Sequence, residues 1–241
     1  MPEPTSASDA GRERNVILAA VPDREYAQMR DRLEPVELGL KDLIFEADKP
    51  MGHVYFPTTA VLSMIAQVDG ETSVEVATIG REGMAGLPVF LGVTASPNTV
   101  FAQIPGAAMR MRADQLHEVL TGDGALHWQL HRYIQATMVL LAQNVACNRL
   151  HSTEERAARW LLMTADRVDA DRFPLTQEFL AQMLGVRRAT VSLTAGLLHQ
   201  AGLISYRRGV ITIEDRAGLH DAACDCYDIV RGEFDKLTKP D

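Results

Sequence analysis

The chain has 241 residues, 46% of them hydrophobic and 23% charged, which suits two folded units and excludes disorder for most of its length. No apolar run approaches the roughly 20 residues of a membrane helix, and residues 1–15 lack the apolar core of a signal peptide. Three cysteines are too few for a secreted disulfide framework. We therefore expect a cytoplasmic protein with reduced thiols and no membrane partner.

Charge is distributed unevenly along the chain. The net charge of −8 argues by itself against nucleic acid, because binding to phosphates requires local cations. Residues 154–216, however, hold nine arginines against eight acidic residues, so this segment carries +1 and the rest of the chain −9. The least acidic segment is therefore the candidate for a nucleic-acid contact.

The sequence of the first 33 residues indicates a tail followed by short helices. Residues 1–14 are small, polar and charged, which is typical of a flexible tail. Between Val16 and Leu33 apolar residues recur at helical spacing and are interrupted by Pro22, so we expect one or two short helices.

Residues 36–111 have the pattern of an antiparallel β domain. Short runs rich in Val, Ile, Phe and Thr are separated by Gly and Pro. The clearest hairpin joins residues 61–68 to 73–79 through Asp69-Gly70, where glycine allows the positive φ of a tight turn. A Gly-rich stretch then leads to strands at 99–104 and 107–111.

No Pro or Gly interrupts residues 126–150, which predict one long helix. A 4-3-4-3-4 stripe along it keeps one face toward a partner helix and suggests a homodimer interface. The stripe consists of Leu130, Ile134, Thr137, Leu141, Asn144 and Asn148. Half of these residues are polar, so the alternative is that the stripe packs on the chain's own β domain.

Residues 175–198 predict a helix-turn-helix. Thr176 is suited to cap the first helix, and Gly185 to end it in a left-handed conformation. A second helix follows within three residues, with Val191 and Leu198 facing inward. In a helix-turn-helix the second helix enters the major groove of DNA.

A hairpin follows the second helix and places cations beside it. Residues 203–206 and 210–213 alternate as strands around Arg207-Arg208-Gly209, which is the arrangement of a wing. The alternative is an ordinary helix pair and hairpin. Because order, spacing and wing agree, the sequence favours a DNA-binding transcription regulator.

Almost the whole chain resembles the Crp/Fnr superfamily of bacterial regulators. The resemblance rests jointly on VYFP at 54–57, GREGM at 80–84, NRLHSTEERAARWLL at 148–162, residues 175–204 and the wing ending at 211–213. It implies an α+β chain with a flexible tail (1–14), a cyclic-nucleotide-binding-like β jelly roll (15–118), a dimerisation helix (119–153) and a C-terminal winged helix-turn-helix (154–241). It also implies promoter DNA and RNA polymerase as partners.

DNA contacts follow from the resemblance only at matching positions. Thr176 matches a position that contacts phosphate, and Arg188 matches an arginine that reads guanine O6 and N7. Ala189 replaces the usual glutamate and Leu193 a second arginine, so the half-site should differ from the standard one. The expected DNA-binding residues are Thr176, Gln177, Arg187, Arg188, Ala189, Thr190, Ser192, Arg207 and Arg208.

The resemblance gives only part of an effector site. Members that bind cyclic AMP hold the ribose with a Gly-Glu turn and the phosphate with an Arg-Ser pair. The Gly-Glu turn is present in altered form as Gly80-Arg81-Glu82-Gly83. Residues 96–99, which align with the Arg-Ser pair, read Ser-Pro-Asn-Thr and supply no cation for the phosphate. We expect no cyclic AMP and no resident cofactor, and another small molecule or none. The candidate pocket is Gly80, Arg81, Glu82, Gly83, Ser96 and Asn98.

Metal, redox and catalytic functions find little support in the sequence. His127 and His131 lie four residues apart but lack a third ligand. Cys224 and Cys226 are expected within one helix, pointing to different faces, so packing is favoured over redox sensing. An iron-sulfur sensor would need about four cysteines. We therefore expect no metal site and no enzyme, and a regulator that responds to a cyclic nucleotide, a metal or redox change remains the alternative.

Overall fold

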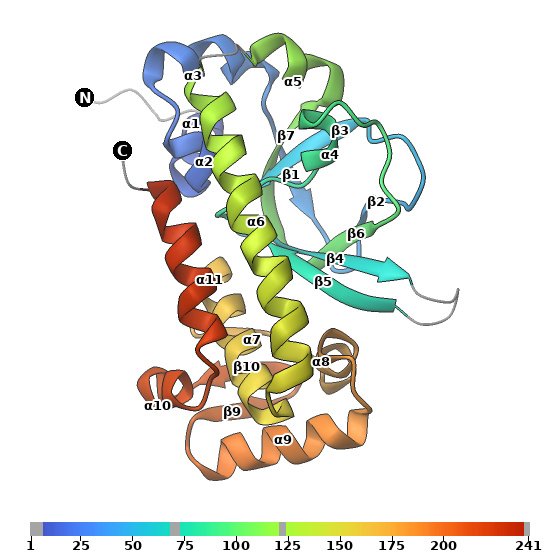
Figure 1. Cartoon of the computed structure of the whole chain (residues 1–241). Helices are drawn as coiled ribbons and strands as arrows, with labels where there is room; N and C mark the ends of the chain where they lie inside the picture. The colour runs from blue at the N-terminus through green and yellow to red at the C-terminus, as the bar shows by residue number, and fades with distance from the viewer. Residues whose placement is uncertain (1–6, 68–72, 121–123, 239–241) are drawn as a thin grey trace, which may run out of the picture.

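A computed structural model describes residues 7–67, 73–120 and 124–238 and has three parts in chain order (Figure 1). Short helices come first, a β domain follows, and a long helix then leads to a compact C-terminal unit. None of the helices in the described ranges is long and apolar enough to span a membrane. The short N-terminal helices are α1 (Ala7–Arg14), α2 (Val16–Ala19), α3 (Asp23–Met29) and η1 (Arg30–Arg32).

Two antiparallel sheets form the β domain and confirm the predicted jelly roll. Their strand orders are β1-β7-β3 and β2-β6-β4-β5. The predicted hairpin is β4 with β5, in the register Gln67 opposite Ser73; its turn at Asp69-Gly70 lies outside the described residues. The strands are β1 (Glu34–Leu38), β2 (Leu43–Phe45), β3 (His53–Pro57), β4 (Val61–Gln67), β5 (Ser73–Ile79), β6 (Thr99–Ile104) and β7 (Gly106–Arg112), with α4 (Leu87–Phe90) between β5 and β6.

Helix α1 packs on the β domain, so the prediction of a flexible tail is wrong for residues 7–14. Gly11 lies so close to Met109 of β7 that a Cβ on Gly11 would lie 2.5 Å from the Met109 sulfur. The guanidinium of Arg12 sits 4.4 Å from the centroid of the Tyr26 ring and pairs with Asp23. These contacts join residues distant in sequence, and composition alone does not reveal them.

Helix α6 (Ala125–Leu150) is the long helix that the sequence predicts, and α5 (Ala113–Val119) precedes it. The C-terminal unit consists of α7 (Thr153–Val168), β8 (Arg172–Pro174), α8 (Gln177–Leu184), α9 (Arg188–Gln200), β9 (Ile204–Arg207), β10 (Val210–Ile213), α10 (Arg216–Asp221), α11 (Cys226–Asp235) and η2 (Lys236–Thr238). Ser152 and Glu155 form a reciprocal capping box at the start of α7, which fixes the turn between α6 and α7.

The chain returns at its C-terminal end to the long helix. Helix α11 runs beside α6 toward the N-terminal helices (Figure 1). Leu237 is buried in the core of the β domain, whereas Tyr227 is buried in the core of the C-terminal unit. Residues 226–238 therefore pack between the predicted domains rather than within the winged helix alone.

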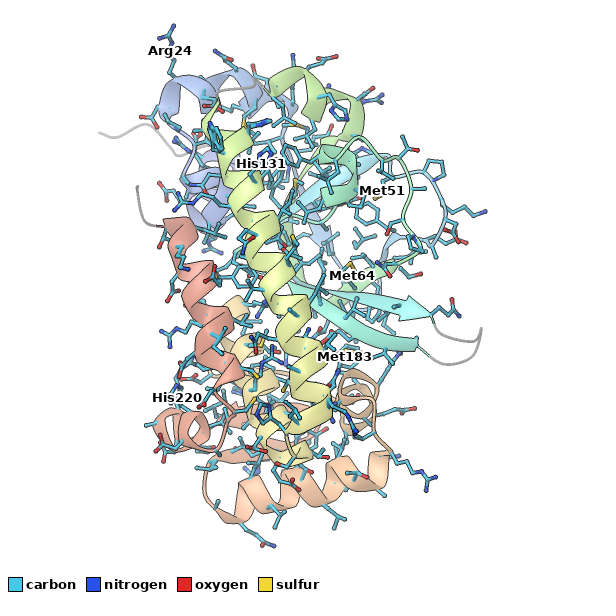
Figure 2. The ribbon with its side chains drawn as sticks, viewed as in Figure 1. Arg24, Met51, Met64, His131, Met183 and His220 are labelled. Atoms are coloured by element: carbon cyan, nitrogen blue, oxygen red, sulfur yellow. The ribbon has the colours of Figure 1, made fainter. Side chains whose placement is uncertain are left out.

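The two units share apolar contacts. Val61 and Ile104 of the β domain belong to the same buried cluster as Leu161 of α7. Met64 of β4 and Met183 of α8 lie on the two sides of this junction (Figure 2). A shared core limits how far the units can move apart without exposing apolar surface.

Candidate nucleic-acid interface and interdomain contacts

Thr176 begins the first helix of the pair, as predicted. Its backbone is extended, and its Oγ1 accepts a hydrogen bond from the Phe179 amide at 3.1 Å. At the other end Gly185 has a φ of 62°, the left-handed conformation that glycine adopts without strain. Both predicted helix boundaries are confirmed, because the residues responsible act locally.

Helix α9 presents polar side chains outward. Val191, Thr194 and Leu198 are buried, whereas Arg187, Arg188, Ala189 and Ser192 are exposed and Thr190 is half-buried. Ser192 Oγ donates to Gln177 Oε1 of α8 at 3.0 Å, so the two helices share one polar surface. This surface brings together the predicted contact residues of both helices.

A two-residue turn forms the tip of the wing. Arg207 pairs with Val210, and the intervening Arg208 and Gly209 have φ values of 51° and 77°. Consecutive positive φ values are typical of a type I′ hairpin turn. The sequence did not predict β8, which adds a third strand beside β10; the only local signal is the alternation around Phe173.

Four arginines make the α9 and wing surface cationic: Arg187, Arg188, Arg207 and Arg208. All four side chains are exposed, and within the described ranges none has an ion pair or a hydrogen bond. Several arginines elsewhere on the described surface do have an acidic partner, as Arg110 has in Glu34. Unpaired cations at this surface are available to bind phosphate or base edges.

The turn at residues 80–83 lies between the β domain and the C-terminal unit. Glu82 pairs with Arg167 of α7 at 2.9 Å, and both side chains are largely buried. A Cβ on Gly83 would lie 2.2 Å from the hydroxyl of buried Tyr133 on α6, so only glycine fits there. The structure thus uses this part of the candidate effector pocket to join the domains.

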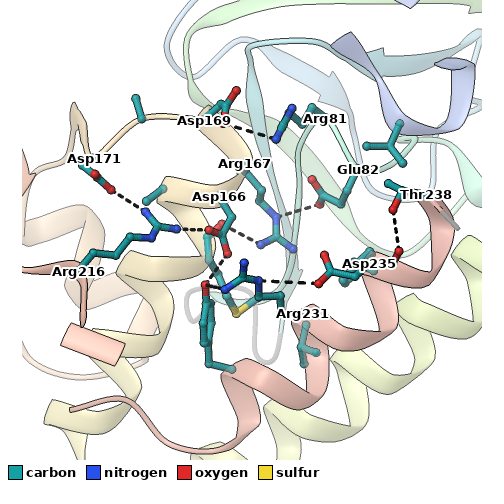
Figure 3. Close-up of a pocket in the computed structure, with 17 residues that line it drawn as sticks. Arg81, Glu82, Asp166, Arg167, Asp169, Asp171, Arg216, Arg231, Asp235 and Thr238 are labelled. Atoms are coloured by element: carbon teal, nitrogen blue, oxygen red, sulfur yellow. Dashed lines mark hydrogen bonds and ion pairs between the residues drawn. The ribbon is translucent and has the colours of Figure 1, made fainter. Parts of the chain in front are cut away.

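A cleft of about 520 Å³ opens beside this turn (Figure 3). Its lining includes four arginines and five carboxylates, so the cleft has no excess of positive charge for an anion. Arg81 lies 3.5 Å from Asp169 of the α7 C-terminus and faces this cleft. The charged residues are Arg81, Arg167, Arg216 and Arg231 with Glu82, Asp166, Asp169, Asp171 and Asp235.

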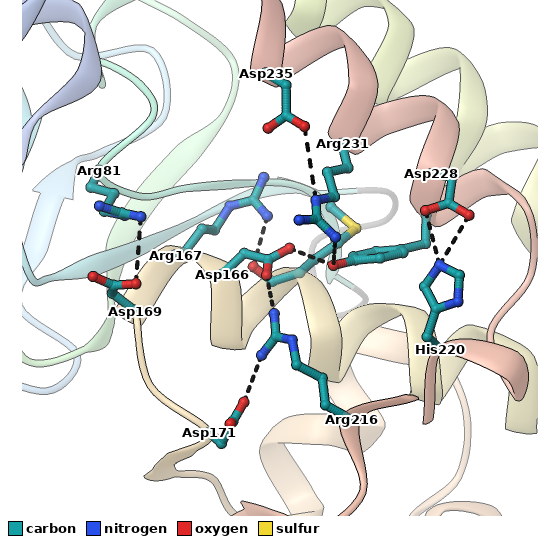
Figure 4. Close-up of polar contacts among 12 residues, drawn as sticks. Arg81, Asp166, Arg167, Asp169, Asp171, Arg216, His220, Asp228, Arg231 and Asp235 are labelled. Atoms are coloured by element: carbon teal, nitrogen blue, oxygen red, sulfur yellow. Dashed lines mark hydrogen bonds and ion pairs between the residues drawn. The ribbon is translucent and has the colours of Figure 1, made fainter. Parts of the chain in front are cut away.

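Ion pairs tie α7, α10 and α11 together along this cleft (Figure 4). Arg216 of α10 binds both Asp166 and Asp171, and the Tyr227 hydroxyl donates to Asp166 at 2.8 Å. Burial raises the pKa of Tyr227 to about 12, so it stays protonated as a donor. The network fixes the C-terminal helices relative to α7.

Ser96 and Asn98 line a different space from Arg81 and Glu82. They line a small space of about 50 Å³ inside the jelly roll, among mainly apolar side chains such as Met64 and Val100. The Asn98 amide donates to Ser96 Oγ at 3.2 Å, and no charged residue lines this space. Of the six predicted pocket residues, Ser96 and Asn98 thus line this space, whereas Arg81 and Glu82 line the larger cleft.

Glu75 of β5 connects the sheet to α7. Its carboxylate accepts hydrogen bonds from Ser63 at 2.7 Å and from the Trp160 indole of α7 at 2.9 Å. Burial raises the pKa of Glu75 from 4.5 to about 7. The carboxyl is therefore neutral in the folded protein below pH 7.

This shift predicts a pH-dependent stability. Between about pH 4.5 and 7 the folded chain keeps a proton that the unfolded chain has lost, so the free energy of unfolding falls as pH rises, by at most about 1.4 kcal/mol per pH unit. Glu75→Gln should remove this dependence and exceed the parent in stability at pH 8. Urea unfolding at pH 5 and 8 measures the free energy of unfolding of each variant. The exposed Glu37→Gln is the control and should keep the pH dependence of the parent. An equal change in the free energy of unfolding between the two pH values for the parent and Glu75→Gln would contradict the pKa shift.

The predicted dimer stripe on α6 packs largely within the chain. Leu130 is fully buried, and Asn144 donates to the Val76 carbonyl of β5 at 2.8 Å. Ile134, Thr137 and Leu141 are half-buried, and only Asn148 is exposed. The prediction is wrong for Leu130, because this side of α6 covers the β domain.

A different face of α6 is exposed. It recurs at 3-4 spacing and includes Trp128, Met138 and Val145, which are 58%, 61% and 73% exposed. We call it the outer face of α6; its members are Trp128, His131, Gln135, Met138, Ala142, Val145 and Arg149. His127 and His131 contact the Phe90 ring edge-to-face, and no third metal ligand joins them in the described part of the chain.

Comparisons with known proteins agree with this geometry. Residues 155–222 match the Crp-like helix-turn-helix domain family. Among solved structures, FixK2 from Bradyrhizobium japonicum superposes with a TM-score of 0.68 at 17% identity, covering 80% of this chain and 98% of that one. A CRP/FNR-family transcriptional regulator from Thermus thermophilus gives 0.62 at 17%, covering 79% and 98%. The c-di-GMP-responsive regulator CLP from Xanthomonas campestris gives 0.64 at 12%, covering 80% and 100%.

No curated protein matches the chain in sequence. The family match and the superpositions nevertheless agree on one class of protein. The C-terminal unit is a Crp-like helix-turn-helix domain, and the chain has the fold of Crp/Fnr regulators. Fold and domain together define a DNA-binding transcription regulator of the Crp/Fnr type.

Proposed function

We propose that the chain acts as a homodimer that reads a near-palindromic promoter site. Each protomer places α9 in a major groove, and the two grooves lie about one helical turn apart. The observation that supports this most directly is the group of four exposed, unpaired arginines on α9 and the wing of an otherwise acidic chain. RNA polymerase at the same promoter is the protein partner that such a regulator recruits or excludes.

The outer face of α6 is the proposed dimer interface. Its apolar members are exposed at the spacing that lets two helices pack along a common seam. Helix α11 and the β domain already cover other sides of α6. A second copy of α6 would bury Met138 and Val145 and hold the two α9 helices at a fixed separation.

Regulation by cyclic AMP is not part of the proposal. The space inside the jelly roll is about 50 Å³, far below the roughly 300 Å³ of small ligand pockets, and no arginine or lysine lines it. Burying a phosphate there without a cation would be costly. An effector bound inside the jelly roll would have to be smaller and less charged than a cyclic nucleotide.

Substitutions at two arginines test the DNA-binding proposal. Arg188→Ala should cost about 1–3 kcal/mol at one base position and relax specificity there, because a guanidinium can pair with guanine in two places. Arg207→Ala should weaken binding to all sequences alike and reduce its salt dependence, because the wing would contact phosphate. Selection of bound fragments from a random library, at two salt concentrations, measures both effects.

Arg24→Ala serves as the matched control. Arg24 is exposed on α3, at the end of the molecule opposite α9 (Figure 2). Its loss should change neither affinity nor specificity. If Arg188→Ala selected the same sites with the same affinity as the parent, the base-reading role would be wrong. If no fragment bound in a salt-dependent way, the C-terminal unit would not bind DNA at all.

A further inference from the structure

Three thiols and one imidazole converge where α6 ends and α11 begins. Cys147 lies in the last turn of α6 and His151 follows that helix, while Cys226 begins α11 and Cys224 lies two residues before it. The four potential ligand atoms all lie within 4.8 Å of one another. The three cysteines are buried and form a cluster of their own, apart from both apolar cores.

This cluster corrects the expectation from the sequence. Cys224 and Cys226 were expected at alternate positions of one helix, pointing to different faces. Helix α11 begins only at Cys226, so Cys224 belongs to the preceding turn and its side chain can point the same way. Cys147 joins them from a segment 77 residues earlier, to within 3.4 Å of the Cys224 sulfur.

The distances suit the ligands of a single ion. Tetrahedral coordination with Zn–S bonds of about 2.3 Å and Zn–N bonds of about 2.0 Å separates two sulfurs by about 3.8 Å, and sulfur from nitrogen by about 3.5 Å. Here the Cys147 and Cys224 sulfurs are 3.4 Å apart, and Cys226 sulfur lies 3.6 Å from His151 Nδ1. We propose that these four side chains bind one Zn²⁺ ion as a Cys₃His site.

The surroundings favour a site with net negative charge. Zn²⁺ with three thiolates and a neutral imidazole carries −1, and two cations of α7, Arg156 and Arg159, lie near these cysteines. Arg159 is 93% buried, and its Nε has no hydrogen-bond partner within the described residues.

Two other chemistries fit these residues less well. A disulfide between Cys147 and Cys224 would use two thiols and leave Cys226 and His151 without a role. An iron-sulfur cluster distributes its terminal ligands over different iron atoms, so it needs them farther apart than the ligands of one ion. Four soft ligands within 4.8 Å match a mononuclear thiolate site better than either.

The proposed ion would join the two ends of the helix-turn-helix segment. Residues 153–221, from α7 to α10, lie between His151 and Cys224 in sequence. One ion would therefore close this segment at the base of the long helix. Binding would stabilise the folded chain and release thiol protons, because it requires deprotonated ligands that unfolding separates.

Metal content and Co²⁺ substitution test the site on the full-length protein. Protein purified with reductant from zinc-supplemented cells should contain about one Zn²⁺ per chain by elemental analysis. Replacement by Co²⁺ should produce the visible bands of a tetrahedral ion and the near-ultraviolet charge-transfer bands of thiolate ligands. Zn²⁺ should also raise the unfolding temperature of the metal-depleted chain.

Cys226→Ser removes one ligand and keeps its size. We expect it to lower Zn²⁺ affinity by more than about 100-fold, because losing a ligand costs more than losing a group that only orients one. His151→Ala provides a second variant, which should keep thiolate charge-transfer bands but change the visible Co²⁺ spectrum. His127→Ala is the control: it removes a histidine of α6 that lies outside the proposed site, and this variant should bind the metal as the parent does.

Three results would overturn the proposal. One is protein without stoichiometric zinc, without thiolate bands on Co²⁺ addition and with three freely titrating thiols. The second is a Cys147–Cys224 disulfide in protein prepared without oxygen. The third is iron together with acid-labile sulfide. None of these results depends on DNA binding, so the metal site and the proposed function fail independently.

Discussion

The double substitution Met138→Asp and Val145→Asp should make the chain monomeric and weaken binding to a two-half-site DNA by about 10²- to 10⁴-fold. Both side chains lie exposed on the outer face of α6, where a partner helix would bury them. In a dimer, once one DNA-binding domain has bound its half-site, the second domain binds the other half-site intramolecularly. A monomer loses the affinity that this linkage adds. Light scattering after gel filtration gives the mass, and titration of labelled DNA gives the affinity.

Leu40→Asp and Leu91→Asp are the matched controls for this experiment. Both leucines are about as exposed as Met138, at 60% and 61%, but neither lies on α6. Their variants should stay dimeric and bind DNA like the parent. A dimer that survives the double substitution on α6 would place the interface elsewhere on the molecule.

Arg167→Met should lower the free energy of unfolding by about 3–5 kcal/mol. It leaves the carboxylate of Glu82 largely buried without its cation, and such a charge is costly to keep from water. Arg167 also donates to the Met163 carbonyl and lies over the Phe234 ring, so the substitution loses contacts to α7 and α11 as well. Urea unfolding followed by circular dichroism measures the loss.

A neighbouring arginine separates the effect of burial from that of charge. Arg81→Met removes an exposed pair, 3.5 Å from Asp169, and should cost less than about 1 kcal/mol. Adding Glu82→Gln to Arg167→Met should recover part of the loss, since no unpaired charge would remain. Equal losses for Arg167→Met and Arg81→Met would show that burial does not determine the strength of this contact.

These contacts link the β domain to the C-terminal unit. Glu82 and Gly83 contact α7 and α6, and α7 leads directly into the helix-turn-helix. A signal that shifted the turn at 80–83 would act on α7 through Arg167.

Local patterns in the sequence determined the order of the helices and strands and which residues lie on the α9 and wing surface. Thr176 caps a helix, Gly185 ends it, and Arg208-Gly209 forms a two-residue turn, each through its own backbone and near neighbours. The contact residues of α8, α9 and the wing lie within 33 residues of sequence. Short-range rules therefore suffice to place them on one surface.

Only the tertiary structure decided which side of α6 is covered and what meets at its ends. Both Leu130 and Val145 belong to stripes with 3-4 spacing, and the return of α11 and the docking of the β domain bury one stripe and expose the other. Cys147 meets Cys224, 77 residues later in the chain, because α11 packs beside α6. Such contacts depend on long-range packing, for which periodicity along a single segment carries no signal.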